Sequence, residues 1–280
     1  YYSILPRIFL GAMITITRMM TMNKLGKFVA VHSFKGGTGK SLIATNLALI
    51  LAKKGRKTCL LDLDMRAPGL RVVFEKANPK FWLNDFLDES CEIESVLIDL
   101  SSIYNIAEGC LYVGLANPSI EAIQQALVKD RKREMKALQH LLSLRKKLIK
   151  ELGFDCVILD TSPGIQYSSL NAIVASDVIL LICINDETDI DGTRRMVQNL
   201  YDAFEKKSAI IINRALCEDA YQKEREELFK KFQATFDTPL IEIIPLYCDI
   251  LKTSRTSLIA LEKPEHSFVK SLVRIMEKLE

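Results

Sequence analysis

The sequence predicts a doubly wound α/β fold, in which a mostly parallel, seven-stranded sheet carries helices on both faces. Seven short apolar runs recur along the chain, each the length of one buried strand. Longer segments with apolar residues at helical spacing separate them, and this alternation is typical of sheets that bind ligands at the C-terminal ends of their strands. The runs are 28–31, 58–64, 111–115, 154–160, 175–184, 208–214 and 240–244.

The composition is that of an ordinary globular protein, with 49% apolar and 26% charged residues. A chain of 280 residues is long enough for one large α/β domain, and we assign residues 27–280 to a single domain. The net charge of +3 is too small to imply a nucleic-acid partner by itself.

Residues 1–26 do not share the pattern that follows, and we interpret them as an N-terminal extension that is disordered or precedes the true start. Their apolar run, 8–17, is too short to span a bilayer and has no small-residue cleavage site for a secretory signal. The alternative interpretation is a short, basic, amphipathic membrane anchor.

The seven cysteines include no Cys-x-x-Cys pair. Cys59, Cys156 and Cys183 lie inside apolar runs, which is typical of small buried side chains in a reducing cytosol rather than of disulfides or zinc ligands. The missing Cys-x-x-Cys also counts against an iron–sulfur cluster.

A glycine-rich loop joins the first strand to the first helix. Its sequence is Lys35-Gly36-Gly37-Thr38-Gly39-Lys40-Ser41, and an uninterrupted apolar helix follows it. Glycines let backbone N–H groups converge on an anion, and the N-terminus of a helix adds partial positive charge. Lys40 can reach the terminal phosphates of a nucleotide, and the Ser41 hydroxyl can bind Mg²⁺.

This loop departs from the ordinary phosphate loop, G-x-x-x-x-G-K-[ST], because Phe34 stands where the first glycine would fall and Lys35 adds a second lysine. It resembles K-G-G-x-G-K-[ST], the deviant Walker A motif of the MinD/ParA family of ATPases, which are SIMIBI-class P-loop NTPases. The resemblance extends from about residue 27 to the C-terminus. It implies ATP and Mg²⁺ as cofactors, and an ATP-dependent homodimer in which Lys35 reaches the partner's nucleotide as a catalytic residue beside Lys40.

Two carboxylates end the second strand, which should lie beside the phosphate loop. Asp62 and Asp64 are two residues apart, so they point to the same side of a strand. Buried carboxylates are unfavourable unless a cation lies opposite, and Mg²⁺ near the phosphates would supply one. The resemblance implies that catalytic Asp64 positions the attacking water and that Asp62 holds the outer shell of the metal.

The stretch from Ser119 to Leu152 predicts two helices with a basic face. It contains nine basic and four acidic residues, at helical spacing with apolar ones. The Lys129–Lys150 face could therefore follow an anionic surface, DNA or membrane, or it could be an ordinary solvated face.

A further strand ends in Asp160, followed by Thr-Ser-Pro-Gly. An acid at this point can accept hydrogen bonds from metal-bound water opposite Ser41, and the Pro-Gly turn can reorient when the γ-phosphate leaves. The segment resembles the Walker B and second-switch segment of the family.

The base of the nucleotide is assigned to the last two strands. Asn213 and Arg214 end one of them, and a side-chain amide has both a donor and an acceptor for the edge of a purine. The resemblance implies that Asn213 contacts adenine and that the loop beginning at Pro245 flanks it. The final helix carries Phe268, Leu272 and Ile275 on one face, which we expect to pack on the sheet.

These features together predict an ATP-binding, slowly ATP-hydrolysing dimerisation switch that acts in positioning or partitioning a cellular cargo. We expect it in the cytoplasm, with a protein partner that stimulates hydrolysis and with peripheral binding to nucleoid or membrane as an option. Two alternatives stay open: a metal-insertion or cluster-carrier ATPase, and a ligase or amidotransferase. The sequence offers no candidate Cys–His pair for catalysis by a ligase or amidotransferase.

Overall fold

A computed structural model of the chain describes residues 26–128, 131–201, 204–216, 222–252 and 258–279. The proposed N-terminal extension and the alternative membrane anchor lie outside these residues, so both stay predictions. Over the described residues, eight strands form one sheet in the order β3-β4-β2-β5-β1-β6-β7-β8. The strands are β1 Lys27–His32, β2 Lys57–Leu63, β3 Ile98–Asp99, β4 Cys110–Gly114, β5 Cys156–Thr161, β6 Val178–Ile184, β7 Lys207–Ala215 and β8 Leu240–Pro245.

The seven predicted strands are all present, and they pair in parallel. The eighth, β3, pairs antiparallel with β4 at the edge of the sheet. It contains two residues, which is too short for any periodicity to show in the sequence. The doubly wound, mostly parallel fold is therefore confirmed, with one additional edge strand.

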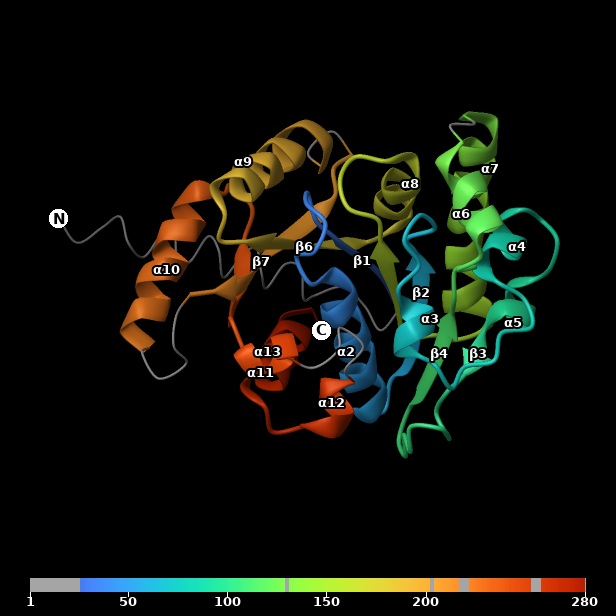
Figure 1. Cartoon of the computed structure of the whole chain (residues 1–280), viewed down its shortest axis with the longest axis horizontal. Helices are drawn as coiled ribbons and strands as arrows, with labels where there is room; N and C mark the ends of the chain where they lie inside the picture. Colours follow the sequence, from blue (N-terminus) through green and yellow to red (C-terminus); the bar gives the residue numbers. More distant parts are fainter. Residues whose placement is uncertain (1–25, 129–130, 202–203, 217–221, 253–257, 280) are drawn as a thin grey trace.

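The helices cover both faces of the sheet (Figure 1). They are α2 Lys40–Lys53, α3 Leu70–Val73, α4 Leu83–Leu87, α5 Ile93–Val96, α6 Ile120–Leu127, α7 Arg131–Lys146, α8 Tyr167–Ala175, α9 Glu187–Met196, α10 Gln222–Thr235, α11 Cys248–Lys252, α12 Ile259–Glu262 and α13 Ser267–Leu279. Two π-helical turns, Lys147–Glu151 and Val197–Tyr201, extend α7 and α9.

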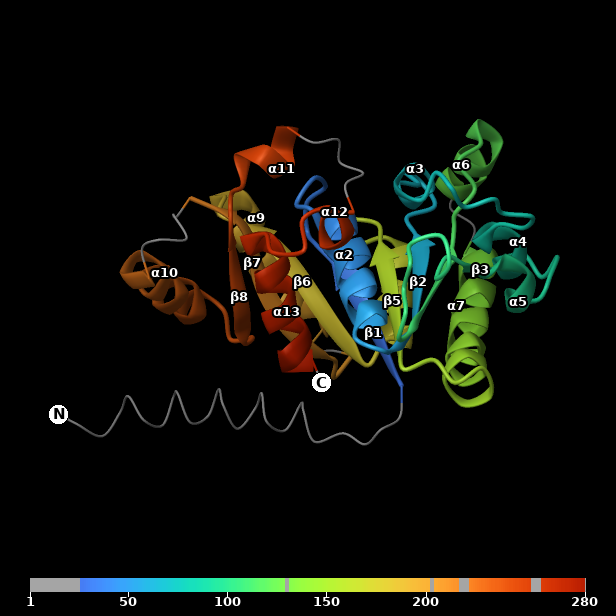
Figure 2. The same ribbon diagram turned by 90° about the horizontal axis from the view of Figure 1, so that it is seen from below.

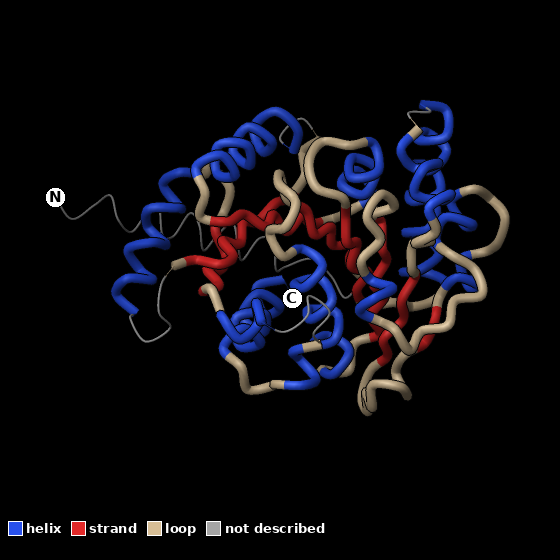
Figure 3. The backbone as a smooth tube through the Cα atoms, in the orientation of Figure 1, coloured by secondary structure: helices blue, strands red, loops and turns tan. Residues whose placement is uncertain are grey.

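Figure 3 shows the sheet running between the two helical layers. On one face α2, α12 and α13 pack into a common core, and on the other α7 and α8 form one cluster while α9 and α10 form another. The final helix packs as predicted, because Phe268, Leu272 and Ile275 are buried against α2 and β8. None of the described helices is both long enough and apolar enough to cross a membrane.

The stretch from Ser119 to Leu152 does form two helices, but the first packs weakly. No residue of α6 is buried, and Ile120 and Leu127 remain more than half exposed. The helical spacing of these apolar residues therefore does not mark a core-facing side here. Figure 2 shows α6 and α3 on the same side of the molecule as the loop between β1 and α2.

Candidate functional site

The glycine-rich loop lies at the C-terminal end of β1, which sits centrally between β5 and β6. Gly37 and Gly39 have φ values of 76° and 97°, in the left-handed region that other residues adopt only with strain. Gly39 is also the N-cap of α2, and a Cβ there would lie 2.5 Å from Nδ2 of Asn213. The glycine is thus required both by the backbone and by the approach of β7.

Phe34, which replaces the first glycine of an ordinary phosphate loop, packs against α9. A Cβ on Gly192 would lie 2.1 Å from its ring, so the ring occupies the space that the glycine leaves. The backbone N–H of the next residue, Lys35, donates to the buried carboxylate of Asp189 (3.2 Å). The ring and this hydrogen bond tie the start of the loop to α9.

The two lysines of the loop have different surroundings. The Lys35 ammonium forms an ion pair with Asp186 (2.5 Å) at the N-terminus of α9, and about a third of its side chain is exposed. Lys40 is buried and donates to Oγ of Ser33 (3.0 Å). Burial lowers the pKa of Lys40, while the nearby carboxylates of Asp160 and Asp64 act in the opposite direction.

Two of the predicted carboxylates face each other on adjacent strands. Asp62 on β2 pairs in register with Asp160 on β5, and both are buried. Burial raises the pKa of Asp62 well above its usual range, and Asp160 adds to the shift. The two carboxylate oxygens of Asp62 accept hydrogen bonds from the backbone N–H groups of Asp64 and Leu70. Asp62 therefore also fixes the loop that follows Asp64.

The buried pair suits a cation. Burial raises the pKa of Asp160 to about 7, and a hydrogen bond with the Ser41 side chain opposes the shift. The Oδ1 atom of Asp160 is buried without a hydrogen-bond partner among the described residues. A hydroxyl and two carboxylates are the oxygen donors that Mg²⁺ prefers, so Ser41, Asp62 and Asp160 fit the predicted metal.

Asp64 is held by the segment after β5. The Ser162 hydroxyl donates to its Oδ1 atom (3.0 Å), and the N–H of Gly164 donates to the carbonyl of Ser33 (2.9 Å). One turn thereby contacts both Asp64, the acid predicted to position water, and Ser33 at the start of the phosphate loop. Ser162 was not predicted as a site residue, although it directly follows the D-T pair of the predicted switch.

A cavity of ≈ 790 Å³ joins the two halves of the predicted site. Its phosphate end is lined by Gly36, Gly37, Gly39, Lys40 and Ser41, with Asp64 beside them. Its other end is lined by Asn213, Arg214 and Pro245, the residues predicted for the base, by Tyr247 of the loop predicted to flank it, and by Phe268, which was predicted only to pack on the sheet. Its size fits a nucleotide, because small-molecule sites usually measure about 300–1,000 Å³.

Four predicted residues do not line this cavity. Thr38, Asp62 and Asp160 are buried behind its wall, and Lys35 points to Asp186. Asn213 lines it, but its Nδ2 atom donates to the carbonyl of Thr38 (2.8 Å). In this structure Asn213 therefore braces the phosphate loop, and its Oδ1 atom is the part left for a base.

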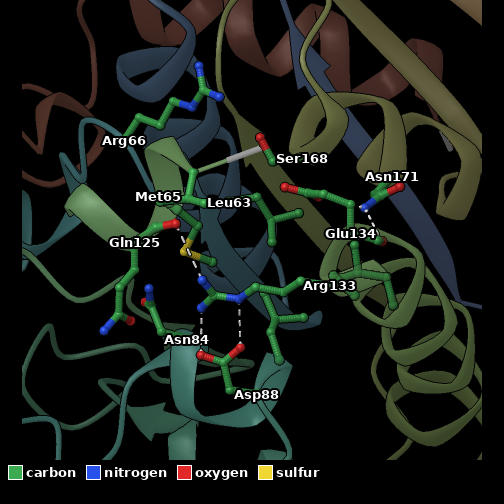
Figure 4. Close-up of a pocket in the computed structure, with 15 residues that line it drawn as sticks. Leu63, Met65, Arg66, Asn84, Asp88, Gln125, Arg133, Glu134, Ser168 and Asn171 are labelled. Carbon is green, nitrogen blue, oxygen red and sulfur yellow. Dashed lines mark hydrogen bonds and ion pairs between the residues drawn. The ribbon is translucent and has the colours of Figure 1, made fainter. Parts of the chain in front are cut away.

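A second cavity of ≈ 80 Å³ is lined by residues of α4, α6, α7 and α8 (Figure 4). Arg133 of α7 spans it with two hydrogen bonds to Asp88 and one to the carbonyl of Gln125. Met65, in the loop after β2, and Ser168, in α8, also line it. Arg66 lines both cavities, and in Figure 4 its side chain points away from the Arg133–Asp88 pair.

The predicted basic face of α7 is largely neutralised within the domain. Lys136 pairs with Glu89, Arg145 with Asp177, and Lys147 with Glu92 and Glu94. Arg133 pairs with Asp88. Lys129 and the side chain of Arg131 lie outside the described residues. At least four basic side chains of the described part of Lys129–Lys150 are therefore paired with acids of the same domain, and binding of this face to DNA or membrane stays a prediction.

A parallel sheet with a glycine-rich loop on its central strand, a buried lysine and paired carboxylates at its C-terminal edge defines a P-loop nucleotide-binding protein. A family model described as "AAA domain" matches residues 26–216, so the chain belongs to that family. Its similarity to MinD proteins identifies the chain further as a MinD/ParA family ATPase, as the sequence predicted.

Septum site-determining protein MinD of Thermotoga maritima is 27% identical over 84% of this chain and 80% of its own. An uncharacterized ATP-binding protein of Methanocaldococcus jannaschii is 26% identical over 78% of this chain and 73% of its own. The fold matches that of MinD from Pyrococcus horikoshii, solved with Mg-ADP, at a TM-score of 0.72 and 20% identity, over 91% of this chain and 96% of that one.

Proposed function

We propose that this protein is an ATP-binding, slowly ATP-hydrolysing dimerisation switch that positions or partitions a cellular cargo. One observation carries the proposal: Lys40, Ser41 and Asp64 line one end of a nucleotide-sized cavity while a second lysine, Lys35, stands outside it. Membership of the MinD/ParA family supports the ATPase activity. The name of the Thermotoga relative, a septum site-determining protein, supports a role in spatial positioning.

The phosphate end would bind the β- and γ-phosphates through the loop N–H groups and Lys40. Lys40 would exchange its hydrogen bond to Ser33 for a charge-assisted bond to phosphate, which is stronger. Bound Mg²⁺ would neutralise charge that develops on the phosphates. Ser41 would hold the ion directly, and Asp62 and Asp160 would accept hydrogen bonds from its water shell.

Asp64 would orient the attacking water, whose oxygen bonds to the γ-phosphorus as the bond to the ADP oxygen breaks. The Ser162 hydroxyl already fixes the Asp64 carboxylate at 3.0 Å. Because Ser162 also belongs to the turn that contacts the phosphate loop, loss of the γ-phosphate would release both segments together.

Lys35 would act between two copies of the chain. It is not needed for phosphate binding by its own loop, because Lys40 fills that role at the cavity wall. We propose that in the ATP-bound homodimer Lys35 leaves Asp186 and contacts the nucleotide of the partner. The protein would work in the cytoplasm, with a protein partner that stimulates hydrolysis and a peripheral association with nucleoid or membrane.

Nucleotide binding is tested with Lys40→Ala, and Lys54→Ala is the matched control at the exposed C-terminus of the same helix. Calorimetry with Mg-ATP should show an affinity loss of about 30-fold or more in Lys40→Ala, the value of a lost charge-assisted contact. Lys54→Ala should bind as wild type. Unchanged affinity in Lys40→Ala would contradict the assignment.

The dimer is tested by light scattering with ATP. Wild type should dimerise, whereas Lys35→Ala should bind ATP and stay monomeric. Asp64→Ala should accumulate as the dimer while releasing phosphate about a hundredfold more slowly, because the water loses its orienting acceptor. A dimer in Lys35→Ala, or wild-type phosphate release in Asp64→Ala, would refute the corresponding role.

A further inference from the structure

The base end of the large cavity is built by two separate segments. Tyr247 lies between β8 and α11, and Phe268 lies in the first turn of α13. Both line the cavity, although they lie 21 residues apart in the sequence. The relative position of these aromatic side chains therefore depends on contacts through space.

His266 supplies such contacts at a single side chain. Its ring lies edge to face with the ring of Tyr247, with centroids 4.8 Å apart and an interplanar angle of 77°. Its Nδ1 atom accepts a hydrogen bond from the backbone N–H of Phe268 (3.0 Å). Its Nε2 atom lies 3.3 Å from Oδ2 of Asp249 in α11, and only 17% of the side chain is exposed.

These contacts need the neutral imidazole in one tautomer. Because Nδ1 accepts from Phe268, the proton lies on Nε2, where it faces the Asp249 carboxylate. One ring thereby caps α13, orients the first residues of α11 and supports the Tyr247 ring. No other natural side chain offers this combination, since asparagine can cap the helix but has no ring.

We propose that His266 is a positioning residue for the nucleotide base, because it holds Tyr247 and Phe268 in place as one wall of the cavity. The inference rests on the proposed function and concerns the base end of the same site. A wall that is already ordered loses less side-chain freedom when a ligand binds, which favours affinity. His266 does not line the cavity, so its effect on the base passes through Tyr247.

The test separates this role from simple helix capping. His266→Asn retains a good N-cap acceptor for α13 but removes the ring and the contact with Asp249. Lys263→Gln is the matched control, because it removes another ion-pair partner of Asp249 (2.6 Å) and leaves both rings in place. Each protein is titrated calorimetrically with Mg-ATP and with Mg-tripolyphosphate, which has the phosphates but no base.

We expect His266→Asn to bind Mg-ATP about fivefold to tenfold more weakly and to bind tripolyphosphate as wild type, since an ordered aromatic contact is worth about 1 kcal/mol. Lys263→Gln should bind both ligands as wild type. Tyr247→Leu should show the same selective loss, and the double variant His266→Asn/Tyr247→Leu should be no weaker than Tyr247→Leu alone.

Wild-type affinity for Mg-ATP in His266→Asn would overturn the inference while leaving the proposed function intact, and so would equal weakening of Mg-ATP and tripolyphosphate binding. An additive loss in the double variant would overturn it too, because His266 would then act independently of Tyr247. If wild type binds neither ligand, the proposed function itself fails.

Discussion

The contact between Phe34 and Gly192 predicts that Gly192→Ala weakens ATP binding, although Gly192 does not line the cavity. The added Cβ would lie 2.1 Å from Cε1 and 2.2 Å from Cδ1 of Phe34, where contacts under 3.0 Å essentially never occur. The ring must move, and its backbone leads directly into Lys35, whose N–H is bonded to Asp189. The strain should therefore reach the phosphate loop.

Two opposing effects set the size of the change. Alanine favours a helix over glycine by about 1 kcal/mol, and overpacking usually costs about 1–3 kcal/mol. The free energy of unfolding should thus decrease by up to about 2 kcal/mol. If the loop carries about 1 kcal/mol of that strain, the Kd for Mg-ATP should increase about fivefold.

Calorimetry with Mg-ATP and urea unfolding measure the two effects separately. The control is the same substitution in a Phe34→Ala protein, where no ring stands in the way. There Gly192→Ala should leave the affinity unchanged and should stabilise the fold through helix propensity alone. Wild-type ATP affinity in Gly192→Ala would refute this effect of the Phe34 contact, and so would an equal loss of affinity in the Phe34→Ala background.

Three further predictions concern charge and backbone. Burial lowers the pKa of His32 to about 3 from 6.5. The folded state therefore binds fewer protons than the unfolded state, and the free energy of unfolding falls as pH drops below 6.5. At pH 5 this loss should be about 2 kcal/mol in wild type and absent in His32→Asn, as measured by urea unfolding. Arg133→Glu should lower stability by about 1 kcal/mol, because it faces Asp88, whereas Lys150→Glu should not; equal melting temperatures would disprove this. Gly39→Ala should abolish Mg-ATP binding in calorimetry, since φ is 97°, and wild-type affinity would count against the loop geometry.

The phosphate loop was predictable because its conformation is encoded locally. Gly37 and Gly39 adopt the positive φ values that only glycine adopts readily, and the strand and helix around them follow from short apolar runs. The carboxylates at the ends of β2 and β5 could be placed together for a similar reason, because parallel strands end at the same edge of a sheet.

Contacts between distant segments were not predictable. The pairing of Lys35 with Asp186 and of Phe34 with Gly192 depends on β6 lying next to β1, which no periodicity reveals. The ion pairs of α7 were not predictable for the same reason. Its basic residues outnumber the acids of their own stretch, but acids from α5 and from the segment between α4 and α5, such as Asp88, pair with several of them.

The strand order has a consequence for synthesis on the ribosome. Both neighbours of β1, which are β5 and β6, follow it by about 120 residues or more, a length that takes roughly 6–25 s to translate at usual rates. During that time β1 has no native strand to pair with, although its residues from Phe28 to Val31 are fully apolar. Unpaired apolar edges favour aggregation, so the nascent chain is exposed to this risk until β5 emerges. The strand that leads into the phosphate loop is thus the first strand to be synthesised, but its neighbours in the sheet are synthesised much later.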